Sequence, residues 1–164
     1  MLKLYKNIDG KFQYWETWEK DESTSTVHWG VLGEQGESED INSGLFTSFR
    51  KKIQKLIDQK IKEGYHEIEF DEMYTLIVEY EVDGMGTTED IDKRYRLQEK
   101  MDEILGWTGL GHCDGGSIGS GSMEVCCYVV EFDIAKKIIE KEFLGTEFEN
   151  YARIFDENED QNNY

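Results

Sequence analysis

The chain has 164 residues, which is enough for one ordinary domain or two small ones. Hydrophobic residues make up 38% and aromatic residues 13%, enough to bury a core. The net charge of −18 disfavours contact with nucleic-acid backbones and anionic membranes, and favours basic partners. The charge is uneven, because residues 1–70 carry a net −3 and residues 71–164 a net −15.

The N-terminus and the cysteines bear on compartment and cofactors. Residues 1–6 contain no sustained apolar run, so no signal peptide or membrane span is predicted, and we expect a soluble, cytoplasmic protein. Three cysteines are an odd count, which favours reduced thiols over a disulfide framework. Cys126 and Cys127 point to opposite faces of a strand, so they cannot easily share an ion. We therefore predict no metal and no cofactor.

The first part of the chain alternates strand and turn signals before a helix. Asp9-Gly10 separates two β-prone runs and predicts a hairpin, and residues 23–29 predict a further strand. A helix follows with one apolar stripe and Gly64 as its stop, and residues 65–70 alternate like a closing strand. The stripe comprises Phe46, Phe49, Ile53, Leu56, Ile57 and Ile61.

This order, together with two motifs, resembles the WGR domain of nucleic-acid-associated proteins. The motifs are the aromatic run Tyr14-Trp15-Glu16-Thr17-Trp18 and the turn Trp29-Gly30-Val31-Leu32-Gly33-Glu34-Gln35-Gly36, with the helix closing on Gly64-Tyr65. Val31 stands where the family has its arginine. The resemblance covers residues 2–68 and implies a β-sheet-plus-helix fold with a binding surface. Trp29 can be matched by position, and the basic helix face supplies the other candidate binding residues, Arg50, Lys51, Lys52 and Lys55. Alternatively, Trp29 fills the core and the lysines are only solvated.

The second part has a different order. A strictly alternating strand at 74–82 is followed by a helix opened by Thr88, in which Ile91, Tyr95, Gln98, Met101 and Leu105 share one face. Strands at 107–113 and 123–132, a helix from Asp133 and a last strand at 151–155 complete a β-α-β-β-α-β order. That order is typical of a ferredoxin-like sandwich. We therefore predict an α+β protein with a WGR-like domain at 1–70, a ferredoxin-like domain at 71–155 and a disordered acidic tail at 156–164.

The strand at 123–132 is apolar on both faces, whereas helices cover only one face of such a sheet. The other face is expected to be covered by the first half of the chain, by a second subunit in a homodimer, or by a ligand.

A glycine- and serine-rich segment at 114–122 is the most tempting motif for chemistry, because converging backbone N–H groups can hold an anion. It lacks the lysine of a phosphate-binding loop and precedes a strand, so a plain hairpin loop is the simpler interpretation. Its candidate residues are His112, Asp114, Gly115, Gly116, Ser117, Gly119 and Ser120. Cys113 lies on the opposite strand face from His112 and Asp114, which disfavours a thiol nucleophile.

We predict a non-catalytic protein that binds a protein partner, in particular a basic one, as inhibitor and immunity proteins do. One alternative is nucleic-acid binding or regulation through the WGR-like part, which the net charge disfavours. Another is a sensor of small molecules or anions, or an enzyme, built on the segment at 111–122.

Overall fold

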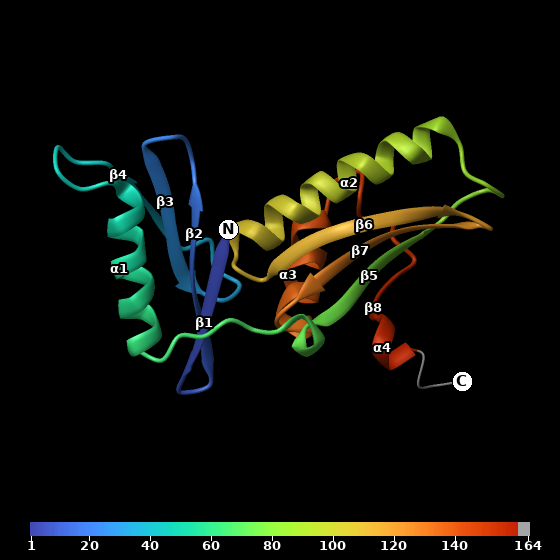
Figure 1. Ribbon diagram of the computed structural model, residues 1–164. Helices are drawn as coiled ribbons and strands as arrows, with labels where there is room; N and C mark the ends of the chain where they lie inside the picture. Colours follow the sequence, from blue (N-terminus) through green and yellow to red (C-terminus); the bar gives the residue numbers. More distant parts are fainter. Residues whose placement is uncertain (161–164) are drawn as a thin grey trace. The chain divides into compact units, whose positions relative to one another are not determined.

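The computed structural model describes residues 1–160 and divides into two compact units, Met1–Glu69 and a second that begins at Phe70 (Figure 1). Each unit contains its own antiparallel sheet of four strands with helices packed beside it. The protein is therefore of mixed α+β class, as the sequence predicts.

The first unit is a meander of four antiparallel strands in the order β1-β2-β3-β4. The strands are β1 (Leu2–Ile8), β2 (Lys11–Glu19), β3 (Thr24–Val31) and β4 (Glu37–Asn42). The hairpin predicted at Asp9-Gly10 is confirmed: both residues have positive φ, 52° and 83°, and Ile8 pairs with Lys11. Positive φ at both central residues matches the right-handed twist of the flanking strands.

Helix α1 (Phe49–Lys62) covers one face of this sheet. Ser48 caps it, its hydroxyl accepting a hydrogen bond from Lys51 N–H. The core joins Leu4, Trp15 and Val27 of the sheet to Phe49 and Ile53 of the helix, with Tyr65 at the margin. Because the helix begins only at Phe49, the predicted stripe loses its first member: Phe46 lies in the preceding loop and is 98% exposed. The strand expected at 65–70 reduces to one bridge between Tyr5 and His66.

The second unit has the predicted β-α-β-β-α-β order, preceded by the 3-10 turn Phe70–Glu72. Its elements are β5 (Tyr74–Glu81), α2 (Thr88–Trp107), β6 (Gly111–Gly119), β7 (Ser122–Val129), α3 (Phe132–Phe143) and β8 (Arg153–Asp156). The strands lie in the order β6-β7-β5-β8, and every neighbouring pair is antiparallel. The central strands β7 and β5 thus come from distant parts of the chain.

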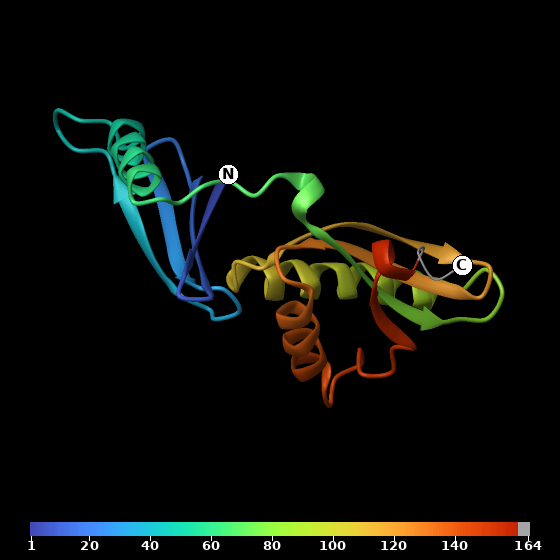
Figure 2. The same cartoon turned by 90° about the horizontal axis from the view of Figure 1, so that it is seen from below.

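Helices α2 and α3 cover one face of this second sheet (Figure 2). Strand β7 alternates between buried and half-buried residues, and its buried set faces the helices. From α2 the buried residues are Leu97, Met101, Ile104 and Leu105, and from α3 Ala135, Ile139 and Phe143. The α2 face expected from the sequence was partly wrong, because Tyr95 is 56% exposed. A second set of residues, Leu97, Met101 and Ile104, also follows the spacing of three and four, and this set packs on the sheet.

The end of the described chain also differs from expectation. Asp156 ends β8 and is buried, and Glu157–Asp160 form a short helix, α4, that contacts β5. The prediction of a disordered tail from residue 156 is therefore wrong for residues 156–160, because Asp156 still belongs to a strand of the sheet and the next four residues form a helix. Residues 161–164 lie outside the described part of the chain. Between residues 1 and 160, no helix combines the length and apolar character needed to cross a bilayer.

Candidate functional site

A buried polar network lies on the face of the first sheet opposite α1. His28 Nδ1 lies 2.7 Å from Glu16 Oε1, and His28 Nε2 lies 2.7 Å from the carbonyl oxygen of Gln35. A carbonyl only accepts, so Nε2 carries a hydrogen and donates it. The Tyr14 hydroxyl donates to the carbonyl of Glu34 and also lies 3.1 Å from His28 Nε2. The network fastens the turn at 32–36 onto the sheet.

Glu16 and His28 are almost completely buried, at 3% and 1% exposed. Lys3 Nζ lies 3.1 Å from Glu16 Oε2, although this oxygen receives no well-aligned hydrogen bond among the described residues. We regard the contact as ionic, since proximity alone provides charge compensation. The pKa of Tyr14 is raised, chiefly by burial and then by the charge of Glu16. The group is therefore a paired network in the interior of the first unit.

The glycines of the Trp-Gly motif serve this packing. Gly36 has φ +66°, and a Cβ there would lie 2.3 Å from both the Tyr14 hydroxyl and the Trp29 carbonyl oxygen. A Cβ at Gly30 would meet Gly36 Cα at 2.8 Å. Only glycine fits such a close approach of two backbone segments. The two glycines of the motif are therefore explained by the close packing of the turn against β3 within this unit.

Trp29 belongs to the α1 face of the sheet, opposite Trp15 in the strand register. Its ring is partly buried and packs against the hydrophobic core of the first unit. A tryptophan in this position contributes mainly to packing. The structure therefore favours the core role of Trp29 over that of a protruding binding residue.

The four basic candidates lie on the first half of α1 but differ in their partners. Arg50 makes a two-pronged pair with Glu19, at 2.8 and 3.1 Å, which lowers the pKa of that carboxyl. Lys52 Nζ donates to the carbonyl of Asn42 at 2.8 Å. Lys51 and Lys55 are exposed, one helical turn apart. Lys51 and Lys55 are thus the members of the set best placed to meet an external anion.

The glycine- and serine-rich segment is mainly a strand, which corrects the prediction of a loop. Residues 111–119 form β6 and pair with β7, and the turn is limited to Ser120 and Gly121. A bulge at Asp114 shifts the register between Cys113 and Gly115. A Cβ at Gly116 would lie 2.2 Å from the Glu124 carbonyl oxygen. These N–H groups alternate along a ladder and do not converge on one point.

The seven predicted residues of this segment do not gather into one site. His112 and Asp114 are exposed, and the Ser117 hydroxyl donates to the carboxylate of Glu124 at 3.3 Å. Gly119 lies beside Met85, and Ser120 lies at the far tip of the hairpin. A carboxylate beside the serine makes this segment a poor site for an anion.

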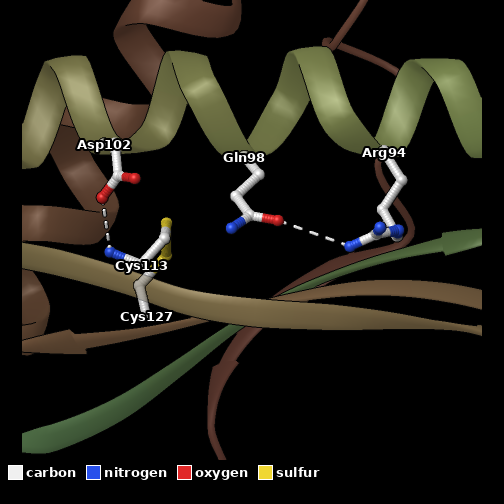
Figure 3. The surroundings of a disulfide bond; sticks show 5 residues. All are labelled: Arg94, Gln98, Asp102, Cys113 and Cys127. Atoms are coloured by element: carbon white, nitrogen blue, oxygen red, sulfur yellow. Dashed lines mark hydrogen bonds between the residues drawn. A yellow bond between two sulfur atoms is a disulfide. The ribbon is translucent and has the colours of Figure 1, made fainter.

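Cys113 and Cys127 are joined by a disulfide, so the expectation of three reduced thiols was wrong (Figure 3). The two residues lie opposite each other in the register of β6 and β7, and their sulfurs therefore share a face. That face is covered by α2, from which Asp102, Gln98 and Arg94 extend toward β6. Asp102 Oδ1 accepts a hydrogen bond from Cys113 N–H at 2.8 Å. A thiol nucleophile at Cys113 is incompatible with this bond.

The remaining cysteine lies on the other face of the second sheet. Burial raises the pKa of the Cys126 thiol, and the charges of Glu157, Asp114 and Glu124 raise it further. Its neighbour Tyr128 contacts Phe70 with ring centroids 4.3 Å apart. Phe70 and α4, both from the same unit, thus cover part of the face whose cover the sequence left open.

An acidic groove of about 790 Å³ lies where β5 and the β6–β7 turn meet the start of α2. Its lining residues are Glu79, Glu81, Val82, Asp83, Thr87, Asp90, Ser120, Gly121 and Ser122. Arg153 pairs with Glu79, and Thr87 donates to Asp90, which lowers the pKa of that carboxyl. Glu81 and Asp83 are exposed at the same groove. The groove therefore attracts cations. The sequence had indicated it only through the acidic composition and through Ser120, the one lining residue among the predicted site residues.

Within residues 1–160, no group of three or more His, Cys, Asp or Glu side chains is arranged to hold a metal ion. Comparisons of the chain with family models, with curated proteins and with solved structures found no match.

Proposed function

We propose that the protein is a non-catalytic binding protein whose second unit holds a basic region of a protein partner. The observation that carries the proposal is the groove at the start of α2, where four carboxylates converge and one arginine offsets them. The unit around it carries 23 acidic and eight basic residues, so its field adds to that of the groove. Basic side chains entering such a cleft meet unpaired acceptors.

The strand order and antiparallel pairing of the second unit support a ferredoxin-like arrangement. The element order of the first unit and its Trp-Gly turn support the WGR resemblance. Both assignments are part of the proposal, and neither by itself implies an activity.

The test compares two variants of equal net charge. The variant Glu81→Lys/Asp83→Lys replaces two negative charges of the groove by positive ones. The variant Glu140→Lys/Glu142→Lys makes the same charge change at exposed positions of α3. The immobilised chain is expected to retain a basic protein from a native lysate at low salt and to release it at high salt. We expect the groove variant to lose retention and the α3 variant to keep most of it. Equal loss in both variants, or no retained partner, contradicts the proposal.

A second candidate function is nucleic-acid binding through α1, which the exposure of Lys51 and Lys55 favours. Trp29 is unsuitable as a probe because its replacement disturbs the core. Lys51→Glu/Lys55→Glu changes two exposed side chains instead. Under this hypothesis the wild type binds single- or double-stranded oligonucleotides at low salt, and the variant does not. If the wild type fails to bind either oligonucleotide at low salt, this function is excluded.

A further inference from the structure

The disulfide joins two cysteines of unequal exposure. Cys127 lies on the inner strand β7 and is 0% exposed, whereas Cys113 lies on β6, at one edge of the described sheet, and is partly exposed. Thiol–disulfide exchange depends on which sulfur an attacking thiolate can reach. We propose that this disulfide is a reversible exchange site for small thiols, with Cys113 as the sulfur that is attacked and modified.

The exchange balances in two steps. A thiolate RS⁻ attacks Cys113 Sγ, forming the mixed disulfide Cys113–S–S–R and expelling Cys127 as a thiolate, which takes a proton from water. A second RS⁻ attacks the sulfur of R in the mixed disulfide, releases RSSR and leaves Cys113 as a thiolate that is protonated in turn. The protein disulfide gains two electrons, and the two small thiols lose them.

The reaction is reversible because the fold keeps the two sulfurs together without the bond. The register places Cys113 and Cys127 opposite each other on the same face. Asp102 of α2 separately holds Cys113 in place by accepting a hydrogen bond from the backbone N–H of Cys113 (Figure 3). In the reduced protein the two thiols therefore remain neighbours, and a small oxidised disulfide can rejoin them through the same mixed disulfide.

Cleavage is expected to loosen β6 selectively. Past the bulge, Gly115–Gly119 contribute no buried side chain, so β6 is held here by its ladder to β7, by contact with α2 and by the disulfide. Strand β7, in contrast, is also paired with β5 and buries four side chains. Opening should thus begin at the edge and leave the centre of the sheet intact.

The site is independent of the proposed binding function, and its test uses the full chain. Air-oxidised protein is treated with 2-mercaptoethanol, quenched with acid at intervals, alkylated, digested and analysed by mass spectrometry. We expect the mercaptoethanol adduct on Cys113 and a newly alkylated Cys127, before any global unfolding detected by circular dichroism. Adduct mainly on Cys127, exchange only at the rate of global unfolding, or three titratable thiols in the oxidised protein would overturn the proposal.

Matched variants test the same asymmetry from the oxidising direction. With Cys126→Ser in both, Cys127→Ser leaves Cys113 as the lone thiol, and Cys113→Ser leaves Cys127. We expect Cys113 to react with the disulfide of 2-mercaptoethanol roughly tenfold or more faster than Cys127, because access limits the reaction. Equal rates in two folded variants would contradict the assignment. If either variant fails to fold, the adduct position in the wild type decides.

Discussion

The two units place their polar side chains in opposite ways. The first buries Glu16 and His28 and pairs them with each other, with a lysine and with a backbone carbonyl. The second buries Asp156 but keeps most of its carboxylates at the surface, where Glu81 and Asp83 line an acidic groove, and a disulfide ties its edge strand to the next strand. Polar groups paired inside a unit define its structure, whereas unpaired groups on its surface are available to a partner. Stability should therefore depend on polar residues in the first unit and much less in the second.

Replacing His28 is the strongest way to test this comparison. His28→Ala leaves the Glu16 carboxylate buried without its closest partner and releases the carbonyl of Gln35. We expect a loss of about 3–5 kcal/mol in the stability of the first unit, typical of breaking a buried pair. Urea denaturation followed by tryptophan fluorescence measures it, since three of the four tryptophans lie in the first unit. Lys20→Ala, which breaks an exposed and solvent-screened pair with Asp40, is the control and should change the stability little.

Reducing the disulfide should have the next largest effect, confined to the second unit. The bond joins residues 14 apart in the sequence and limits the conformations of the unfolded chain. Reduction removes this limit, and for a loop of this length the free energy of unfolding should fall by about 3 kcal/mol. Hydrogen exchange with and without reductant should show faster exchange in β6, with the first unit unchanged. Equal destabilisation of both units would contradict the independence of their cores.

The sequence predicted regular elements where a local pattern determines them. Asp9-Gly10 specified its hairpin because both residues adopt positive φ readily, and the alternation in β5 specified a strand with one buried face. The pairing of Cys113 with Cys127 could not be predicted, since it depends on a register that a bulge at Asp114 shifts. Glycines normally signal a loop, but in β6 they fit the close approach of β7 and α2. These contacts are tertiary, and no local pattern records them.

The network around His28 was missed for a related reason. Tyr14 and Glu16 alternate on one strand, and His28 lies on the next, opposite Glu16 in the register. Strand alternation alone places the three side chains on one face of the sheet, but their polar character predicts that this face is exposed to solvent. Only the turn at 32–36, folded over that face, makes the position interior. In the acidic groove, likewise, Ser120, Asp83 and Asp90 line one surface only once the sheet has formed.

A smaller effect is expected at the start of α2, where Thr87 and Asp90 form a capping box. Thr87→Ala removes the cap and should lower stability by about 1 kcal/mol at neutral pH. Hydrogen bonding from Thr87 lowers the pKa of Asp90 in the folded state. The stability linked to this shift is present above the ordinary aspartate pKa and is lost as the pH falls through the lowered value. The difference in thermal stability between variant and wild type should thus narrow as the pH falls below about 4, the ordinary aspartate value, and a constant difference would contradict this origin.

The smallest effect is expected at Phe46, where hydrophobic character alone predicts a large one. Phe46 is 98% exposed in the loop before α1, whereas Phe49, three residues later, is 3% exposed in the core. Phe46→Ala should change stability by no more than about 0.5 kcal/mol, as surface substitutions do. Phe49→Ala should cost about 3–5 kcal/mol by leaving a cavity. Urea midpoints of the two variants measure the contrast. Comparable losses would mean that Phe46 is buried in solution, and that the apolar stripe of α1 begins one turn earlier.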